Sequence, residues 1–276
     1  MYTNIPDKVD DGIKPMELRY KMKQFPAIVI GGPPHSGKSV LTYGLTQILR
    51  TQQVEHYVLR ACPDGEGDWS QETPPEMVRL LRNKGQFSES FVANVERTLQ
   101  QRHLPLLVDV GGRPTPEQEL LFDHCTHAIL LAADAAGLNQ WRQLAQRHNL
   151  PVLAELQSTL QEDEEIYAER PILRGRISGL ERHQPTSGTL IERLACNIRT
   201  LFALTQAELR AEHLRAAPAE LAVDLERLAR TLGVANGGTW QPAELLSVLD
   251  YLPAGEPLAI YGRGPNWLYE IGRAHV

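Results

Sequence analysis

The sequence has few of the features that mark secreted, membrane-spanning or strongly nucleic-acid-binding proteins. Its 276 residues include only three cysteines, Cys62, Cys125 and Cys196. Their odd number and wide spacing argue against a disulfide framework and against a CxxC metal or redox site. No run approaches the roughly 20 apolar residues that a transmembrane helix needs. The formal net charge is −6, so the chain lacks the overall basic field that drives nonspecific nucleic-acid binding.

The N-terminal segment also lacks the pattern of a secretory signal. Residues 1–24 alternate charges and prolines, whereas a signal peptide has a basic start followed by an apolar run. Hydrophobic residues make up 42% of the chain and charged residues 22%, which is ordinary for a globular protein. We therefore expect a cytoplasmic protein without membrane contact that holds any nucleotide partner locally.

Short apolar runs alternate with helical patterns along most of the chain. The continuous run "FPAIVIGG" (25–32) predicts a strand buried on both faces, and apolar residues at helical spacing predict a helix over 38–51. This alternation indicates a doubly wound, mostly parallel α/β sheet. Further strands are expected at 55–62, 104–112, 127–134, 151–156 and within 170–182, and further helices at 75–85, 88–103 and 188–203.

The composition changes after the last of these helices. We expect residues 1–24 to be an N-terminal extension and residues 25–205 to be the nucleotide-binding domain. An Ala-, Glu-, Leu- and Arg-rich stretch predicts a helical connector over 206–235, broken at Pro218. Residues 236–269 suggest a helix, a turn and a strand, too few elements to close a core alone, so we expect an incomplete α+β module.

One motif in the first domain carries specific chemistry. Gly32, Gly37, Lys38 and Ser39 fit the pattern GxxxxGK[ST] between a predicted strand and a predicted helix. In such a loop, backbone N–H groups from Ser36 onward wrap phosphate oxygens, the lysine reaches the β- and γ-phosphates, and the serine hydroxyl ligates Mg²⁺. The alternative is a glycine-rich strand-to-helix turn with an incidental lysine.

A second candidate metal ligand follows another apolar strand. Asp109 stands at the end of the run "LPLLVDVGG" (104–112), where a carboxylate can face a nucleotide crevice and help Ser39 to hold the metal. The competing interpretation is a solvated strand-end aspartate. Gly111 and Gly112 either let the next loop approach a γ-phosphate or simply make a turn.

The acidic loop "CPDGEGDW" (62–69) offers candidates for a catalytic base or a second metal contact. Asp64, Glu66 and Asp68 follow the second strand, at the sheet edge where ligands bind in such folds. We name Asp64 and Asp68 as catalytic candidates together with Lys38 and Asp109. A solvated turn explains the same acidic pattern equally well.

Arginines gather in "ERPILRGRISGLER" (169–182), and a guanidinium that reached the phosphates would stabilise charge during phosphoryl transfer. If this segment is a strand, Arg174 and Arg176 share one face, with Arg170 and Arg182 at its ends. An exposed basic face balanced by the acidic residues 162–165 is the favoured interpretation.

These features predict an enzyme of the P-loop NTPase or phosphotransferase class with ATP and Mg²⁺ as cofactors. Adenine is favoured over guanine because no NKxD-type sequence follows the fourth strand, where "LLAADAAGL" stands. Two alternatives remain open: a nucleotide-dependent switch or assembly module with little turnover, and an ATP-dependent ligase of the dethiobiotin-synthetase-like branch.

The segment "AIYGRGPNWLY" (259–269) resembles the GRGPxWL signature of CRISPR-associated ring nucleases of type III systems, which degrade cyclic oligoadenylates. Residues 25–205 are similar to the P-loop (AAA or kinase-like) ATPase domain joined to such modules. This resemblance implies a role in antiviral defence, cyclic oligoadenylate or RNA as partners beside ATP, and Mn²⁺ for the nuclease portion. Self-association is a separate option, which belongs with the assembly-module alternative.

The sequence departs from that family after Tyr269, where a histidine- and aspartate-bearing part would follow. Residues 270–276, "EIGRAHV", can be back-translated into the start of a sequencing adapter. We therefore expect an artefact on a truncated reading frame, assign no catalytic role to His275, and expect no ring-nuclease activity from this chain.

Overall fold

A computed structural model describes residues 25–64, 67–83, 85, 87–160, 163–184, 186–215, 217, 219–234, 240–253 and 255–274. The chain divides into two compact units, residues 1–203 and 204–276. The predicted N-terminal extension, Glu66, the break at Pro218 and His275 lie outside the described residues.

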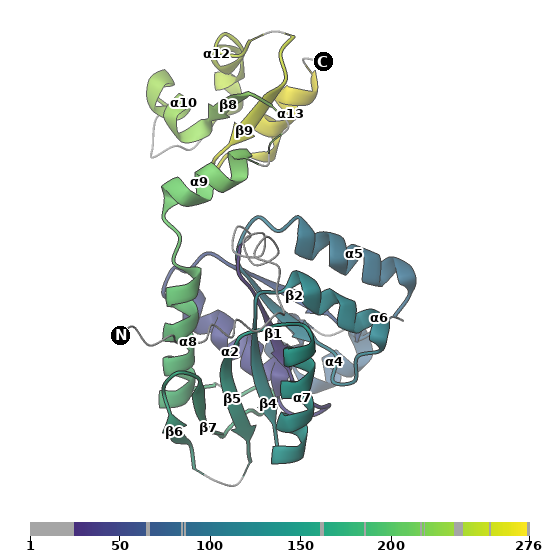
Figure 1. The fold of residues 1–276 in the computed structure, drawn as a ribbon. Coiled ribbons are helices and arrows are strands. Elements are labelled where there is room, and N and C mark those ends of the chain that lie inside the picture. Colours follow the sequence, from purple (N-terminus) through teal and green to yellow (C-terminus); the bar gives the residue numbers. More distant parts are fainter. Residues whose placement is uncertain are drawn as a thin grey trace, which may run out of the picture. The chain divides into compact units, whose positions relative to one another are not determined.

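The first unit contains a seven-stranded sheet in the order β2-β3-β1-β4-β5-β7-β6 (Figure 1). Neighbouring strands are parallel except for the antiparallel pair β6 and β7, so the predicted α/β fold with a mostly parallel sheet is confirmed. The strands are β1 (Ala27–Gly31), β2 (Tyr57–Ala61), β3 (Leu106–Val110), β4 (His127–Ala132), β5 (Val152–Ser158), β6 (Glu165–Ala168) and β7 (Leu173–Ile177).

Strand β6 was not expected from the sequence. Its four residues begin with the last residue of an acidic run and have an exposed or half-buried pattern, so they lack the apolar signal of the central strands. Because β6 is an edge strand, its backbone pairing with β7 rather than side-chain burial defines it.

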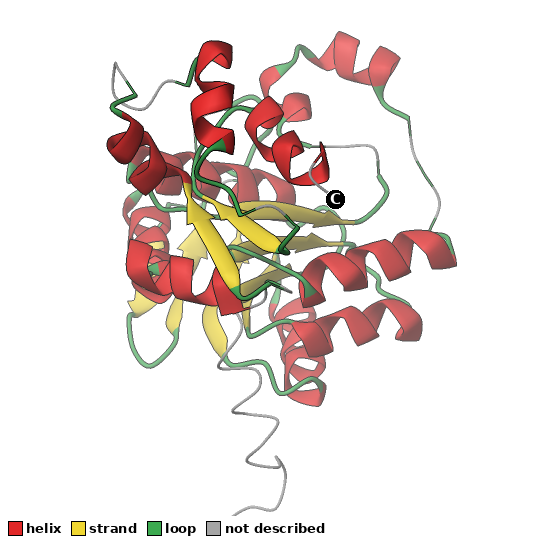
Figure 2. Cartoon of the chain, turned by 90° about the horizontal axis from the view of Figure 1, so that it is seen from above, coloured by secondary structure: helices red, strands yellow, loops and turns green. Residues whose placement is uncertain are grey.

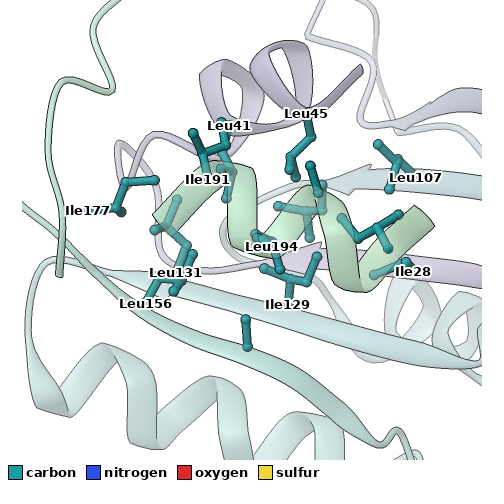
Figure 3. Close-up of a cluster of buried hydrophobic side chains, with 14 of the residues drawn as sticks. Ile28, Leu41, Leu45, Leu107, Ile129, Leu131, Leu156, Ile177, Ile191 and Leu194 are labelled. Atoms are coloured by element: carbon teal, nitrogen blue, oxygen red, sulfur yellow. The ribbon is translucent and has the colours of Figure 1, made fainter. Parts of the chain in front are cut away.

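Helices cover both faces of this sheet (Figure 2). Successive side chains of a strand point to opposite faces, so Ile28 and Ile30 of β1 enter one apolar core and Ala27 and Val29 enter the other. The first core includes side chains of α2 (Lys38–Thr51) and α8 (Thr189–Phe202), as Figure 3 shows. The second includes side chains of α5 (Glu89–Gln100), η1 (Leu120–His124) and α7 (Ala135–Arg147).

Three shorter helices lie in the connections of the first unit: α3 (Trp69–Glu72), α4 (Pro75–Leu81) and α6 (Pro116–Glu119). The strand order places β1 between β3 and β4, and the chain runs to one side of β1 first and to the other side later. In open α/β sheets, ligands bind at the carboxyl ends of the strands beside such a reversal.

The second unit has a two-stranded parallel sheet, β8 (Leu221–Asp224) and β9 (Leu258–Tyr261), with a separate apolar core. Its helices are α9 (Gln206–Arg215), α10 (Leu225–Leu232), η2 (Pro242–Glu244), α12 (Leu245–Leu249) and α13 (Asn266–Ala274). The structure differs from the sequence expectation at residues 221–224, which form a strand within the predicted helical connector. The reason is that β9, far along the sequence, supplies the backbone partners of β8, and local composition does not encode such pairing.

Within the part of the chain that the structure describes, every helix is too short or too polar to cross a lipid bilayer.

Candidate phosphate-binding site

Two motif positions of the loop between β1 and α2 favour glycine, Gly32 because of close packing and Gly37 because of its backbone conformation. A Cβ atom on Gly32 would lie 1.9 Å from the carbonyl oxygen of Leu131. Gly37 has φ 91° and directly precedes the first residue of α2. The two glycines therefore shape a turn that leads into the N-terminus of a 14-residue helix, where backbone N–H groups and the helix dipole favour an anion.

Lys38 begins α2 and is largely buried, with 7% of its surface exposed. Its Nζ donates a hydrogen bond to the carbonyl oxygen of Pro33 at 2.8 Å. Burial lowers the pKa of the Lys38 ammonium, and the nearby charge of Asp109 opposes that shift. Because burial disfavours the charged ammonium, an anion beside it would be stabilising.

Asp109 lies on β3 directly opposite Ile30 of β1, at the same end of the sheet as the loop. It is buried and lines the same cavity as Ser39, so it is not a solvated strand-end aspartate. Burial raises the pKa of the Asp109 carboxyl, and Arg60, Ser39 and Lys38 oppose the rise. The structure thus brings the two predicted metal-ligand side chains together.

Arg60 is the main site residue that sequence reasoning missed. It lies on β2 in register with Asp109 of the adjacent strand β3, and the two side chains form an ion pair. The same guanidinium donates to Asp68 at 3.1 Å, and Asp68 lies 3.5 Å from Arg50. The available signal was a single arginine within the otherwise apolar strand segment "YVLRA".

A cavity of about 730 Å³ joins these groups at the carboxyl end of the sheet. Besides Ser36, Gly37, Lys38, Ser39 and Asp109, its lining includes Asp64, whose backbone carbonyl oxygen accepts a hydrogen bond from Arg82 Nε at 2.7 Å. Asp68 is absent from the described lining. The cavity has the size of a small-molecule site. Its lining carries both signs of charge, with Lys38, Arg60, Arg82 and Arg182 on the basic side and Asp64, Asp109 and Glu181 on the acidic side.

The remaining predicted arginines lie elsewhere or are paired. Arg174 and Arg176 lie two residues apart on β7, so the prediction that they share a strand face is confirmed. Arg174 contacts Glu155 and Arg176 contacts Glu165, each at 2.9 Å. These pairs agree with the favoured interpretation of a basic face balanced by carboxylates, whereas Arg182 lines the cavity.

The segment after β3 packs directly against the loop between β1 and α2. A Cβ on Gly112 would lie 2.3 Å from the backbone nitrogen of Pro34 and 2.7 Å from its Cα. A Cβ on Gly111 would meet Cys62 Sγ only at 3.6 Å, an ordinary contact. Glycine is therefore required by close approach at position 112 but not at position 111.

Cys62 lines the cavity, and burial, aided by Asp64 and Asp109, raises the pKa of its thiol to about 11. Only the thiolate reacts with alkylating reagents, and about one thiol in a thousand is ionised at pH 8. We expect Cys62 to react with iodoacetamide on the order of a hundredfold more slowly than cysteine in a short peptide. Peptide mass spectrometry would follow its alkylation, which should accelerate about tenfold per pH unit from pH 8 to 10. A rate that levels off near pH 8 would contradict this assignment.

The donor set fits a magnesium ion held jointly with a nucleotide. The described residues contain no group of three or more His, Cys, Asp and Glu side chains suited to a metal held by protein alone. Mg²⁺ usually takes one or two carboxylates and completes its octahedron with water and substrate phosphates. The adjacent Ser39 hydroxyl and Asp109 carboxylate provide hard oxygen donors of this kind.

No protein-family model and no curated protein matches the chain. Among solved structures it is similar to the septum site-determining protein MinD with Mg-ADP from Pyrococcus horikoshii, with 11% identity and TM-score 0.37 over 49% of this chain and 70% of that one. A nucleotide-binding protein with ADP from Archaeoglobus fulgidus shares 13% identity at TM-score 0.40, over 66% and 90% of the two chains. A ParA family ATPase from Chlorobium tepidum shares 10% at TM-score 0.39, over 63% and 97%.

Proposed function

We propose that the first unit binds Mg-ATP in the 730 Å³ cavity and acts as a P-loop phosphohydrolase or phosphotransferase. The observation that carries this proposal is that Ser39 and Asp109, from the loop and from β3, line the same cavity beside Lys38. A loop serine and a strand-end aspartate are the two protein ligands that P-loop enzymes use for Mg²⁺. The lysine and helix N-terminus of the same loop support the proposal, because both favour phosphate.

Each candidate residue has a distinct proposed role. The N–H groups of Ser36 to Ser39 would hold phosphate oxygens, and Lys38 would neutralise the β- and γ-phosphates. A bound Mg²⁺ would neutralise phosphate charge and would be held by Ser39 and Asp109. Asp64 is the better candidate for a base, because it lines the cavity and Asp68 is absent from the described lining.

Residues 25–205 would form the complete nucleotide-binding domain in this proposal, with adenine preferred because the guanine-reading NKxD sequence is missing after β4. Three outcomes separate the reaction classes. A hydrolase releases free phosphate, a kinase-like enzyme or a ligase requires an acceptor, and a switch binds ATP with little turnover.

The test is incubation of the full chain with γ-labelled ATP and Mg²⁺, with and without cyclic oligoadenylate and short RNA. We expect labelled product from the wild type and a large loss in Asp109→Asn, because the amide is a weaker metal ligand than the carboxylate. The matched control is Asp123→Asn, the same change at an exposed aspartate beside His148, which should retain turnover. The proposal is overturned if the wild type neither binds ATP nor turns it over.

An association with cyclic-oligoadenylate signalling is a finer proposal that rests on the GRGPNWL motif. This motif comprises the turn after β9 and the first three residues of α13 in the second unit. Tyr269 donates a hydrogen bond to the carbonyl oxygen of Gly262 there, and Leu268 is buried, contacts that a structural turn also makes. Turnover that changes on addition of cyclic oligoadenylate would support the association.

A further inference from the structure

One arginine links two carboxylates of different burial at the edge of the cavity. The two terminal nitrogens of Arg60 contact Asp109 and Asp68, respectively. The Asp109 side chain is 8% exposed and the Asp68 side chain 27%. Arg60 therefore neutralises the buried carboxylate while also contacting a second, wetter one.

This arrangement conflicts with metal binding at the same carboxylate. A magnesium ion on Asp109 would bring two positive charges close to the guanidinium, and like charges a few ångströms apart repel strongly where solvent is scarce. The Asp109–Arg60 ion pair and an Asp109–metal bond therefore compete. Asp68 offers Arg60 a remaining partner at 3.1 Å when that competition is lost.

We propose that Arg60 guards the metal site. In the nucleotide-free protein it compensates the buried charge of Asp109 and also contacts Asp68, and Mg-nucleotide takes Asp109 only when the guanidinium releases Asp109 and keeps Asp68. This inference rests on the proposed function, because it concerns the same site. The relative strength of the Arg60 contacts with Asp109 and with Asp68 then helps to set the Mg²⁺ concentration at which nucleotide binds.

The two carboxylates then predict opposite effects. Arg60→Gln leaves Asp109 buried without its cation, which destabilises the nucleotide-free protein and favours any cation that replaces the arginine. Asp68→Asn removes the charged partner that Arg60 keeps when it releases Asp109. Release of Asp109 to the metal therefore becomes less favourable. A purely structural role for this cluster would not give shifts of opposite sign in metal dependence.

The experiment titrates Mg²⁺ into the full chain with a fluorescent ADP analogue. We expect Arg60→Gln to lower the half-saturating Mg²⁺ about tenfold, equivalent to about 1.4 kcal/mol, and to lower the melting temperature without nucleotide. Asp68→Asn should raise the half-saturating Mg²⁺ severalfold. Arg147→Gln, which breaks an exposed ion pair with Glu119 on another part of the first unit, should leave it unchanged.

The outcomes separate this inference from the proposed function. A wild type that binds the analogue at no Mg²⁺ concentration overturns both. If the wild type shows Mg²⁺-dependent binding and Arg60→Gln weakens it or leaves it unchanged, only the proposed role of Arg60 is overturned. The same holds if Asp68→Asn leaves the Mg²⁺ requirement unchanged or lowers it. If Arg60→Gln does not fold, as judged by circular dichroism, Asp68→Asn decides the question.

Discussion

Replacing Lys38 with alanine is expected to lower ATP turnover by about a hundredfold or more, the scale seen when one preorganised electrostatic group is removed from a transition state. The Lys38 ammonium is largely buried in the candidate phosphate cavity and contacts the Pro33 carbonyl in the nucleotide-free protein. Phosphate oxygens are far better partners for this ammonium than a neutral carbonyl, since they carry formal charge. The loss should therefore appear in turnover and also in affinity for ATP.

Phosphate release would be measured over a range of ATP concentrations, with calorimetry to follow nucleotide binding separately. Arg147→Ala is a suitable control, because it removes an exposed cation from α7 outside the cavity lining. Turnover by the Lys38 variant equal to that of the wild type would contradict the assignment of the loop. If the Arg147 variant retains turnover, removal of one positive charge from the protein does not by itself explain the loss of turnover in the Lys38 variant.

The second large effect is expected from Gly112→Ala. The added methyl group would lie 2.3 Å from the Pro34 nitrogen, far inside van der Waals contact, and backbone on both sides leaves little room to yield. Either the segment after β3 or the loop between β1 and α2 must shift. Overpacking of this kind typically lowers the stability of the folded protein by about 1–3 kcal/mol. We expect nucleotide affinity and turnover to fall at least tenfold, because both segments line the cavity.

Gly111→Ala provides the comparison, since it adds the same methyl group one residue away. Its nearest neighbour would be Cys62 Sγ at 3.6 Å, so we expect a much smaller loss. Nucleotide titration and thermal melting of the two variants would measure this difference. Similar effects at both positions would show that flexibility of the glycine pair matters more than the contact with Pro34.

The predicted β1–loop–α2 unit could be found from sequence because its signals are local. A continuous apolar run, two glycines and a GKS sequence occur within residues 25–39, and each acts on the backbone or ligand beside it. The helix expected over 38–51 has the observed bounds Lys38–Thr51 for the same reason. The position of Asp109 at a strand end was likewise readable from its apolar run.

The residues that contact Asp109 and the loop between β1 and α2 are set by the order of the strands in the sheet. Arg60 meets Asp109 because β2 pairs with β3, and Gly112 meets Pro34 because β3 pairs with β1. The pairing of β8 with β9 similarly joins residues far apart in sequence. The sequence by itself determined the glycine-containing turn between β1 and α2 and the alternation that builds an α/β sheet, since both arise from neighbouring residues. Only the tertiary structure decided which charges face each other, because hydrogen bonding between distant strands sets those contacts and no local pattern encodes it.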